Sequence, residues 1–311
     1  RSVWEPESFH TFFMHKGMYY LPEERRRFHM KGKEKKRKGF RLGYDRATQL
    51  QLHTLMLPGT VLMLLFSIVP LFGLLLAFKN YSVIEGIKGV FTSPWYGFQN
   101  FKVIFGNFDF KRMLVNTLGI NLIGNLVNIV MAILFALFIN EIARPKFKSF
   151  VQTVTYMPHF ISWVVFGGIV ITLLSGDGGL FNQILLKLGV ISQPVVFMAE
   201  PKYFWAIAII SNLVKELGWS TILYTAAISG VDQELYEAAG IDGAGRLKCT
   251  WYITLPGIST TIGIMFIMAI GGILNAGYDQ ILLLQQPANT QISQILDTYV
   301  IQTGIKYGKF E

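Results

Sequence analysis

Long apolar segments alternate with polar connectors along most of the chain. A membrane-spanning helix needs about 20 mostly apolar residues, because each residue advances the helix by about 1.5 Å. Five segments are long enough and carry few or no charges: 55–78, 113–140, 150–175, 204–228 and 253–278. The fourth contains one adjacent charged pair, Lys215 and Glu216. The pattern predicts an all-α integral membrane protein with five spans.

Composition and charge support a membrane protein. The chain is 52% hydrophobic and only 15% charged, whereas soluble domains carry about 25% charged residues. The net charge of +9 raises the alternative of nucleic-acid binding. However, nearly half of the 28 basic residues lie in residues 1–54. We interpret this segment as a basic tail that anchors topology or contacts anionic lipid, and we expect no nucleic-acid partner.

The distribution of Lys and Arg predicts the orientation. With the N-terminus in the cytoplasm, cytoplasmic segments hold about twice as many basic residues as external ones, as the positive-inside rule requires. We therefore expect a basic cytoplasmic tail over 1–54 and a transmembrane domain over 55–311. The connector 229–256 then lies in the cytoplasm, and the polar residues 279–311 follow the fifth span outside.

The connector contains a glycine-broken stretch that is unusual for a loop. Helix formers, Glu237-Ala238-Ala239, precede glycines at 240, 243 and 245, and Pro256 opens the next apolar segment. Glycine adopts left-handed backbone angles readily, and proline suits the first turn of a helix. The pattern predicts a helix, a sharp turn, a second helix and re-entry into the membrane.

Polar and aromatic residues recur inside three spans at helical spacing. Polar groups are costly in lipid and usually face a cavity or another helix. Amides and aromatic faces together are typical of a sugar path, whereas the alternative is hydrogen bonding between helices, worth about 0.5–2 kcal/mol per contact. We interpret Lys215 and Glu216 as an ion-paired structural element, with a role in the path as the alternative. The candidate substrate-path residues are Asn121, Asn125, Asn128, Tyr156, His159, Trp163, Asn212, Glu216 and Trp219.

No catalytic or metal-binding motif is present in the sequence. There is no GxxxxGK[ST] phosphate-binding loop and no HExxH, and Cys249 is the single cysteine. His159 lacks neighbouring ligands in the sequence, which favours a packed or path-lining histidine. We expect no catalytic residue, no metal and no cofactor in this chain.

The connector resembles the EAA motif of binding-protein-dependent ABC importer permeases. The resemblance lies in Tyr236-Glu237-Ala238-Ala239, Asp242-Gly243-Ala244 and Ile253-Thr254-Leu255-Pro256. Further stretches resemble the branch of this maltose-permease-like family that transports complex oligosaccharides and polysaccharides. These include Leu57-Pro58-Gly59, Asn116-Thr117-Leu118, Tyr156–Trp163 and Lys215-Glu216-x-Gly218-Trp219. The resemblance covers residues 50–311.

The resemblance implies a type I permease fold whose sixth span is expected after 311. It implies one permease half that works with a second permease subunit, two ATPase subunits that bind ATP and Mg, and an extracytoplasmic solute-binding protein. It further implies a multi-pass protein of the bacterial cytoplasmic (inner) membrane that imports an oligosaccharide or polysaccharide, with alginate as one specific candidate. The residues implied in ATPase coupling are Tyr236, Glu237, Ala238, Ala239, Asp242, Gly243 and Ala244.

Two other classes of protein stay open on the residues alone. A secondary transporter or channel for a polar solute would work without ATP. A membrane-embedded enzyme would need a clustered catalytic set, which the sequence does not offer. Dependence of uptake on an ATPase partner distinguishes the importer from both.

Overall fold

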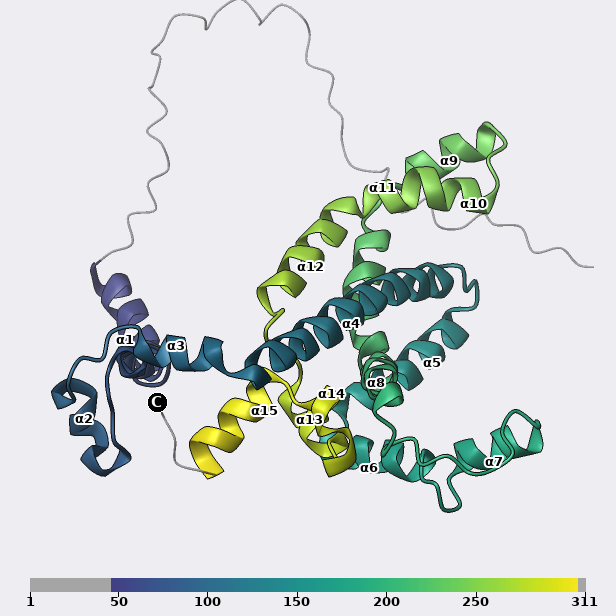
Figure 1. Ribbon diagram of the computed structural model, residues 1–311. Helices are drawn as coiled ribbons and strands as arrows, with labels where there is room; N and C mark the ends of the chain where they lie inside the picture. Colours follow the sequence, from purple (N-terminus) through teal and green to yellow (C-terminus); the bar gives the residue numbers. More distant parts are fainter. Residues whose placement is uncertain (1–45, 307–311) are drawn as a thin grey trace, which may run out of the picture. The chain divides into compact units, whose positions relative to one another are not determined.

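The computed structural model describes residues 46–306, and most of them lie in helices (Figure 1). Most of the predicted basic tail, residues 1–45, lies outside the described residues, as do residues 307–311. The described chain divides into two units, one ending at Met63 and the other beginning at Leu64. Within the described range, the one strand-like pairing is an isolated antiparallel bridge between Lys79 and Trp95. The prediction of an all-α fold is confirmed.

Helix α1 (Arg46–Met63) belongs to the first unit and all other elements to the second. The α-helices of the second unit are α2 (Gly86–Thr92), α3 (Gln99–Gly106), α4 (Phe108–Asn140), α5 (Pro145–Tyr156), α6 (Trp163–Leu173), α7 (Leu180–Lys187), α8 (Pro201–Ser229), α9 (Gln233–Ile241), α10 (Arg246–Cys249), α11 (Leu255–Gly257), α12 (Ser259–Gly271), α13 (Tyr278–Leu284), α14 (Thr290–Ser293) and α15 (Leu296–Ile301). Tighter or wider helical turns join several of them: η2 (Leu64–Ile68), η3 (Val69–Phe78), η4 (Val83–Glu85), η5 (Met157–Phe160), η6 (Thr250–Thr254), η7 (Pro287–Asn289) and η8 (Gln302–Lys306).

Five apolar stretches can cross a membrane, as the hydrophobic pattern predicts. Three are helical throughout, namely Ala47–Phe78, Phe108–Asn140 and Pro201–Ser229. The other two are bent pairs of helices. Pro145–Phe160 meets Trp163–Leu173 at 101°, and Arg246–Gly257 meets Ser259–Gly271 at 58°. The third and fifth segments are therefore broken, whereas the pattern predicts continuous helices.

Prolines and a polar cap account for the break in the third segment. Pro158 lacks an N–H donor, and it lies in the tight turn η5 rather than in a continued α-helix. Ile161 is extended, with φ −79° and ψ 132°. The Oγ of Ser162 then accepts from the N–H of Val165 at 3.4 Å and starts α6.

The fifth segment also ends earlier than expected. A wide turn, η6, precedes Pro256, and Ile258 separates α11 from α12. Helix α12 stops at Gly271, well before the predicted end at residue 278. Consecutive glycines at 271 and 272 favour this early stop because glycine loses more conformational freedom in a helix than other residues.

Helices α4 and α8 form the central pair. Towards their C-terminal ends, Ala132 and Ala136 of α4 are fully buried in one cluster with Tyr224 and Ile228 of α8. At their N-terminal ends, α4 packs closely on α8, since a Cβ added to Gly119 would lie 2.2 Å from the Trp205 ring. The two helices therefore run in the same direction, as the second and fourth spans of a multi-pass protein must.

The polar segment after the fifth span is part of the core. The side-chain amide of Asn116 donates to the carbonyl oxygens of Gln291 and Gln294 at 3.1 and 3.0 Å. The indole N–H of Trp205 donates to the Ile292 carbonyl at 3.2 Å. Figure 1 shows α13, α14 and α15 gathered near the N-terminal end of α4. The expectation of a merely polar external segment was incomplete, because its residues Ile281, Leu284 and Ile295 are fully buried.

The close approach of α5 to α8 gives a test of the packing. A Cβ on Gly218 would lie 2.2 Å from the carbonyl oxygen of Thr155, which is backbone and cannot move away cheaply. We expect Gly218→Ala to destabilise the protein by about 1–3 kcal/mol through overpacking. The apparent melting temperature of the purified complex, followed by size-exclusion chromatography after heating, measures this.

Gly263→Ala is the matched control, because nothing lies within 4 Å of a Cβ at that helical position. It should leave the melting temperature unchanged or raise it slightly, since alanine favours the helix. Equal melting temperatures for the two variants would contradict the packing of α5 on α8.

Candidate functional site

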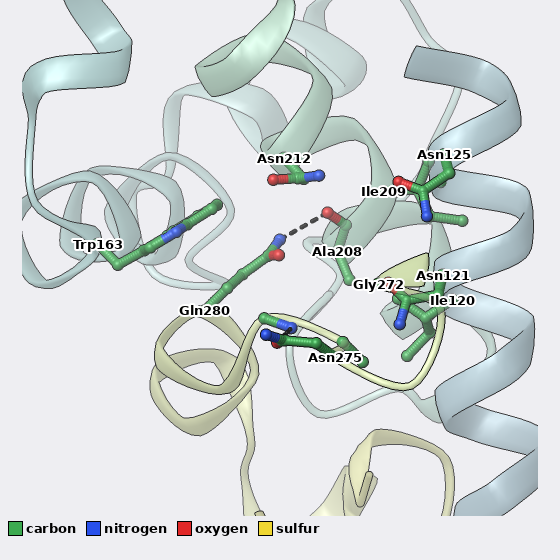
Figure 2. Close-up of a pocket in the computed structure, with 13 residues that line it drawn as sticks. Ile120, Asn121, Asn125, Trp163, Ala208, Ile209, Asn212, Gly272, Asn275 and Gln280 are labelled. Atoms are coloured by element: carbon green, nitrogen blue, oxygen red, sulfur yellow. Dashed lines mark hydrogen bonds between the residues drawn. The ribbon is translucent and has the colours of Figure 1, made fainter. Parts of the chain in front are cut away.

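A polar pocket of about 350 Å³ lies beside the middle of α4. Its wall contains the five carboxamide side chains of Asn121, Asn125, Asn212, Asn275 and Gln280, together with the indole of Trp163. No residue of this wall carries a charge. Figure 2 shows Asn212, Gln280 and Asn275 between Trp163 and the two asparagines of α4.

The pocket draws its wall from four separate parts of the fold. Asn121 and Asn125 are one helical turn apart on α4, so both face the same side. Asn212 comes from α8, and Trp163 is the first residue of α6, directly after the break. The remaining wall is the irregular stretch 272–277 that follows α12, together with Gln280 in the first turn of α13. The break in the third segment and the early end of the fifth therefore create the pocket.

The five amides differ in whether the protein already uses them. Asn121 donates to the carbonyl oxygen of Ile273 at 2.7 Å, and Gln280 donates to Ala208 O at 2.6 Å and to Ser211 Oγ at 2.9 Å. Asn125 and Asn212 are half-buried, and their side chains make no hydrogen bond to any residue within 46–306. Asn275 accepts from the N–H of Gly277 at 3.4 Å, so Asn125 and Asn212 are the two pocket amides that make no hydrogen bond within the described residues and are free to bind a solute.

Four other candidate path residues gather beside the pocket rather than in its wall. The imidazole Nδ1 of His159 lies 2.6 Å from Glu216 Oε2, and its ring stacks on Trp219 with centroids 4.3 Å apart. Lys215 pairs with Glu216 at 3.1 Å, which confirms the predicted ion pair. Tyr156 packs where α5 meets Gly218. Asn128 belongs to neither group.

Two polar side chains of the pocket, Asn275 and Gln280, are not among the residues expected from the sequence. Asn275 and Gln280 lie where the fifth span was expected to end and the external segment to begin. The paired glycines at 271 and 272, followed by amide side chains, are the signal that could have placed them at an irregular, polar wall.

The connector forms the predicted helix, turn and helix. Helix α9 ends in a Schellman motif, in which Ala244 N donates to Ala239 O at 2.9 Å and Gly243 N donates to Gly240 O at 3.1 Å. Gly243 takes the left-handed conformation that this motif needs, with φ +73°. Helix α10 then leads back towards the membrane spans. We call residues 233–249 the hairpin.

The hairpin is tied to the spans at its base and exposed at its tip. The hydroxyl of Tyr236 lies 2.9 Å from the Oγ1 of Thr254, which is buried. Arg246 pairs with Glu141, after the end of α4, at 3.4 Å. At the tip, Ile241 is 89% exposed and Leu247 86% exposed. Glu237 and Ala238 are also exposed, so the hairpin presents apolar side chains beside the carboxylate of Glu237.

Metal binding has no support in the part of the chain that the structure describes. No group of three or more His, Cys, Asp or Glu side chains converges within residues 46–306. His159 is engaged with Glu216 and Trp219 instead.

Comparison with known proteins agrees with this architecture. Residues 128–307 match the family described as the inner membrane component of binding-protein-dependent transport systems. The polygalacturonan/rhamnogalacturonan transport system permease protein YteP of Bacillus subtilis is 40% identical over 276 residues, covering 89% of this chain and 84% of that protein. Protein LplB of the same species is 38% identical over 259 residues, covering 83% and 80%.

Solved structures give the same result. A bacterial ABC transporter involved in the import of the acidic polysaccharide alginate matches with a TM-score of 0.77 and 35% identity, covering 84% of this chain and 86% of that one. The bacterial alginate ABC transporter in complex with an alginate pentasaccharide-bound periplasmic protein matches equally well. The resemblance inferred from the motifs is confirmed, and the chain belongs to the family of inner membrane components of binding-protein-dependent transport systems.

Proposed function

We propose that this chain forms half of the translocation path of an ATP-driven importer for an oligosaccharide or polysaccharide. The observation that carries the proposal is the uncharged, amide-lined pocket with an indole wall, enclosed by the spans of a permease of this family. A second permease subunit would supply the other half of the path. The alternative of an ATP-independent transporter has no comparable support.

The pocket has the chemistry that sugars need. A carboxamide offers both a donor and an acceptor, as a hydroxyl does, so the two groups can exchange hydrogen bonds in either direction. The indole of Trp163 offers a flat apolar surface to the C–H face of a sugar ring. The free amides of Asn125 and Asn212 support direct contact with hydroxyls, whereas Asn121 and Gln280 brace the wall.

The hairpin is the proposed coupling element. We infer that Glu237, Ala238, Ala239 and Asp242 dock on an ATPase subunit, which would bind ATP and Mg²⁺. Small alanine side chains allow close approach, the exposed carboxylate of Glu237 suits a basic partner, and exposed Ile241 and Leu247 extend the apolar contact. In this proposal the hairpin and the N-terminus lie in the cytoplasm, and the chain resides in the bacterial inner membrane.

The relatives suggest an acidic polysaccharide as the substrate class. One matching structure is that of a transporter involved in the import of alginate, and one relative is named for the transport of polygalacturonan and rhamnogalacturonan. We propose oligosaccharides of these kinds as the first substrates to test.

The importer reconstituted with its partner permease, ATPase subunits and binding protein should hydrolyse ATP faster with alginate or galacturonate oligosaccharides. Uptake that persists without ATP would reject the importer in favour of a secondary transporter.

Removing the two free amides tests the pocket. We expect the double substitution Asn125→Leu and Asn212→Leu to raise the half-saturating substrate concentration about tenfold, because each lost hydrogen bond is worth about 0.5–1.5 kcal/mol. Substrate-stimulated ATP hydrolysis by the reconstituted complex measures this.

Asn128→Leu is the matched control, since it makes the same chemical change on α4 outside the pocket wall. An equal effect of the control and the double variant would show that the pocket does not bind the solute.

A proline exchange tests the hairpin turn. Proline at 243 cannot adopt φ +73° and loses the N–H bond to Gly240. We expect Gly243→Pro to preserve membrane assembly but to abolish substrate stimulation of ATP hydrolysis in the reconstituted complex.

The control is Gly245→Pro, two residues away. Gly245 has φ −75°, which suits proline, so this variant should keep its coupling. Normal stimulation in Gly243→Pro would refute the coupling role of the turn.

A further inference from the structure

The break in the third segment interrupts the helical backbone hydrogen bonds inside a membrane span. The chain turns through 101° between α5 and α6, so carbonyl groups near the break lack helical partners. Unsatisfied backbone groups are costly in a membrane, and irregular backbone persists only where protein surrounds it. The partner of this break is α8.

Lys215 of α8 contacts both sides of the break. Its ammonium donates to the carbonyl oxygen of His159 at 2.7 Å, before the break. The same ammonium lies 5.5 Å from the ring centroid of Trp163, the first residue after the break. Lys215 is only 4% exposed, so this cation is held inside the protein. A cation facing an indole ring in such a desolvated setting is attracted to it.

Glu216 and Trp219 complete the attachment. Glu216 accepts from Lys215 at 3.1 Å and pairs with His159 at 2.6 Å. Trp219 stacks on the His159 ring, nearly parallel at 3°. Gly218 brings α8 against the backbone of Thr155. One contact therefore joins two motifs that were recognised separately in the sequence. The stretch Tyr156–Trp163 packs against Lys215-Glu216-x-Gly218-Trp219.

We propose that Lys215 is a positioning residue that holds Trp163 in the wall of the substrate pocket by bridging the break between η5 and α6. This proposal rests on the proposed function, because the position of the indole affects transport only if the pocket binds the substrate. Lys215 does not line the pocket, so its effect on the solute passes through Trp163. A neutral side chain at 215 would release the His159 carbonyl and the indole together.

The substitution Lys215→Met is suited to the test because it removes the cation while Glu216 keeps a hydrogen-bonding partner and access to solvent. Glu216 keeps His159 as a partner, and its side chain is 25% exposed. Methionine approximates the volume of lysine without its cation. Lys202→Met is the matched control on the same helix, since the Lys202 side chain is 67% exposed and 4.0 Å from Glu200.

The first experiment measures the geometry of the break in the assembled complex. Spin labels are placed at Val154 on α5 and Ile169 on α6, both exposed, in a Cys249→Ser chain with cysteine-free partners. Double electron–electron resonance should show a broader distance distribution in Lys215→Met than in Lys202→Met. An unchanged distribution in Lys215→Met overturns the proposal.

The second experiment asks whether Lys215 acts through Trp163. Lys215→Met and Trp163→Ala should each raise the half-saturating substrate concentration for ATP hydrolysis about tenfold, with a maximal rate within about twofold of the parent. In the double variant the two effects should not multiply, because the lysine has lost the ring that it positions. Multiplying effects overturn the positioning role.

The two experiments separate this proposal from the proposed function. If Lys215→Met broadens the distances while Trp163→Ala leaves half-saturation unchanged, the bridge across the break is supported and the pocket is not the substrate site. A fall in maximal rate alone, with unchanged half-saturation in Lys215→Met, indicates a structural role only and overturns the positioning of Trp163.

Discussion

Satisfying polar backbone groups inside the membrane is the constraint on which this structure depends. Two spans are broken, and α8 provides partners at the irregular stretches that result. It binds the His159 carbonyl through Lys215, receives the Gln280 amide on the Ala208 carbonyl, and reaches the Ile292 carbonyl through Trp205. Lipid offers no hydrogen bonds, so each irregular stretch depends on neighbouring elements for its partners: Lys215 of α8 at the break in the third segment, and Asn121 of α4 at Ile273 after α12. Helix α8 is therefore the element around which the pocket is assembled.

This constraint also separates structural polar groups from groups that can serve a solute. The side-chain amides of Asn116 and Asn121 donate to backbone carbonyl groups that follow α12 in the chain. The amide of Gln280 donates to the carbonyl of Ala208 on α8. Asn125 and Asn212 make no such bond within the described residues and face the pocket. A half-buried amide without a protein partner keeps its donor and acceptor available to water or to a solute. The pocket groups available to a solute are thus the amides of Asn125 and Asn212 and the indole of Trp163.

Apolar length and glycine chemistry were enough to predict much of the fold, namely the five segments and the turn at Gly243. The substrate-path residues were chosen by helical spacing, which holds only within an unbroken helix. Tyr156, His159 and Trp163 were expected on one face, but the break after Phe160 sends Trp163 to the pocket and leaves His159 with Glu216. Hydropathy could not reveal this, because both arms of the bend are apolar. The roles of Asn275 and Gln280 depend on contacts far apart in the sequence, which no local pattern contains.

The arrangement of α8 and α12 relates the proposed coupling site to the pocket. The hairpin joins the C-terminal end of α8 to the start of the fifth segment. Farther from the hairpin, the first half of α8 carries Asn212 of the pocket, and the stretch 272–280 follows the far end of α12. Tyr236 ties the hairpin to Thr254, and Val231 packs against Gly257, so the base of the hairpin follows both spans closely.

In contrast, α4 meets the hairpin through the exposed pair of Arg246 and Glu141, a kind of contact that is worth little in water. In the proposed mechanism, a pull on the hairpin therefore reaches the pocket through α8 and the fifth segment, and α4 follows because it packs on α8 through Ala132 and Ala136. Asn125 and Asn212 would therefore move together as one wall of the path, and in this proposal the path opens and closes against the second permease subunit.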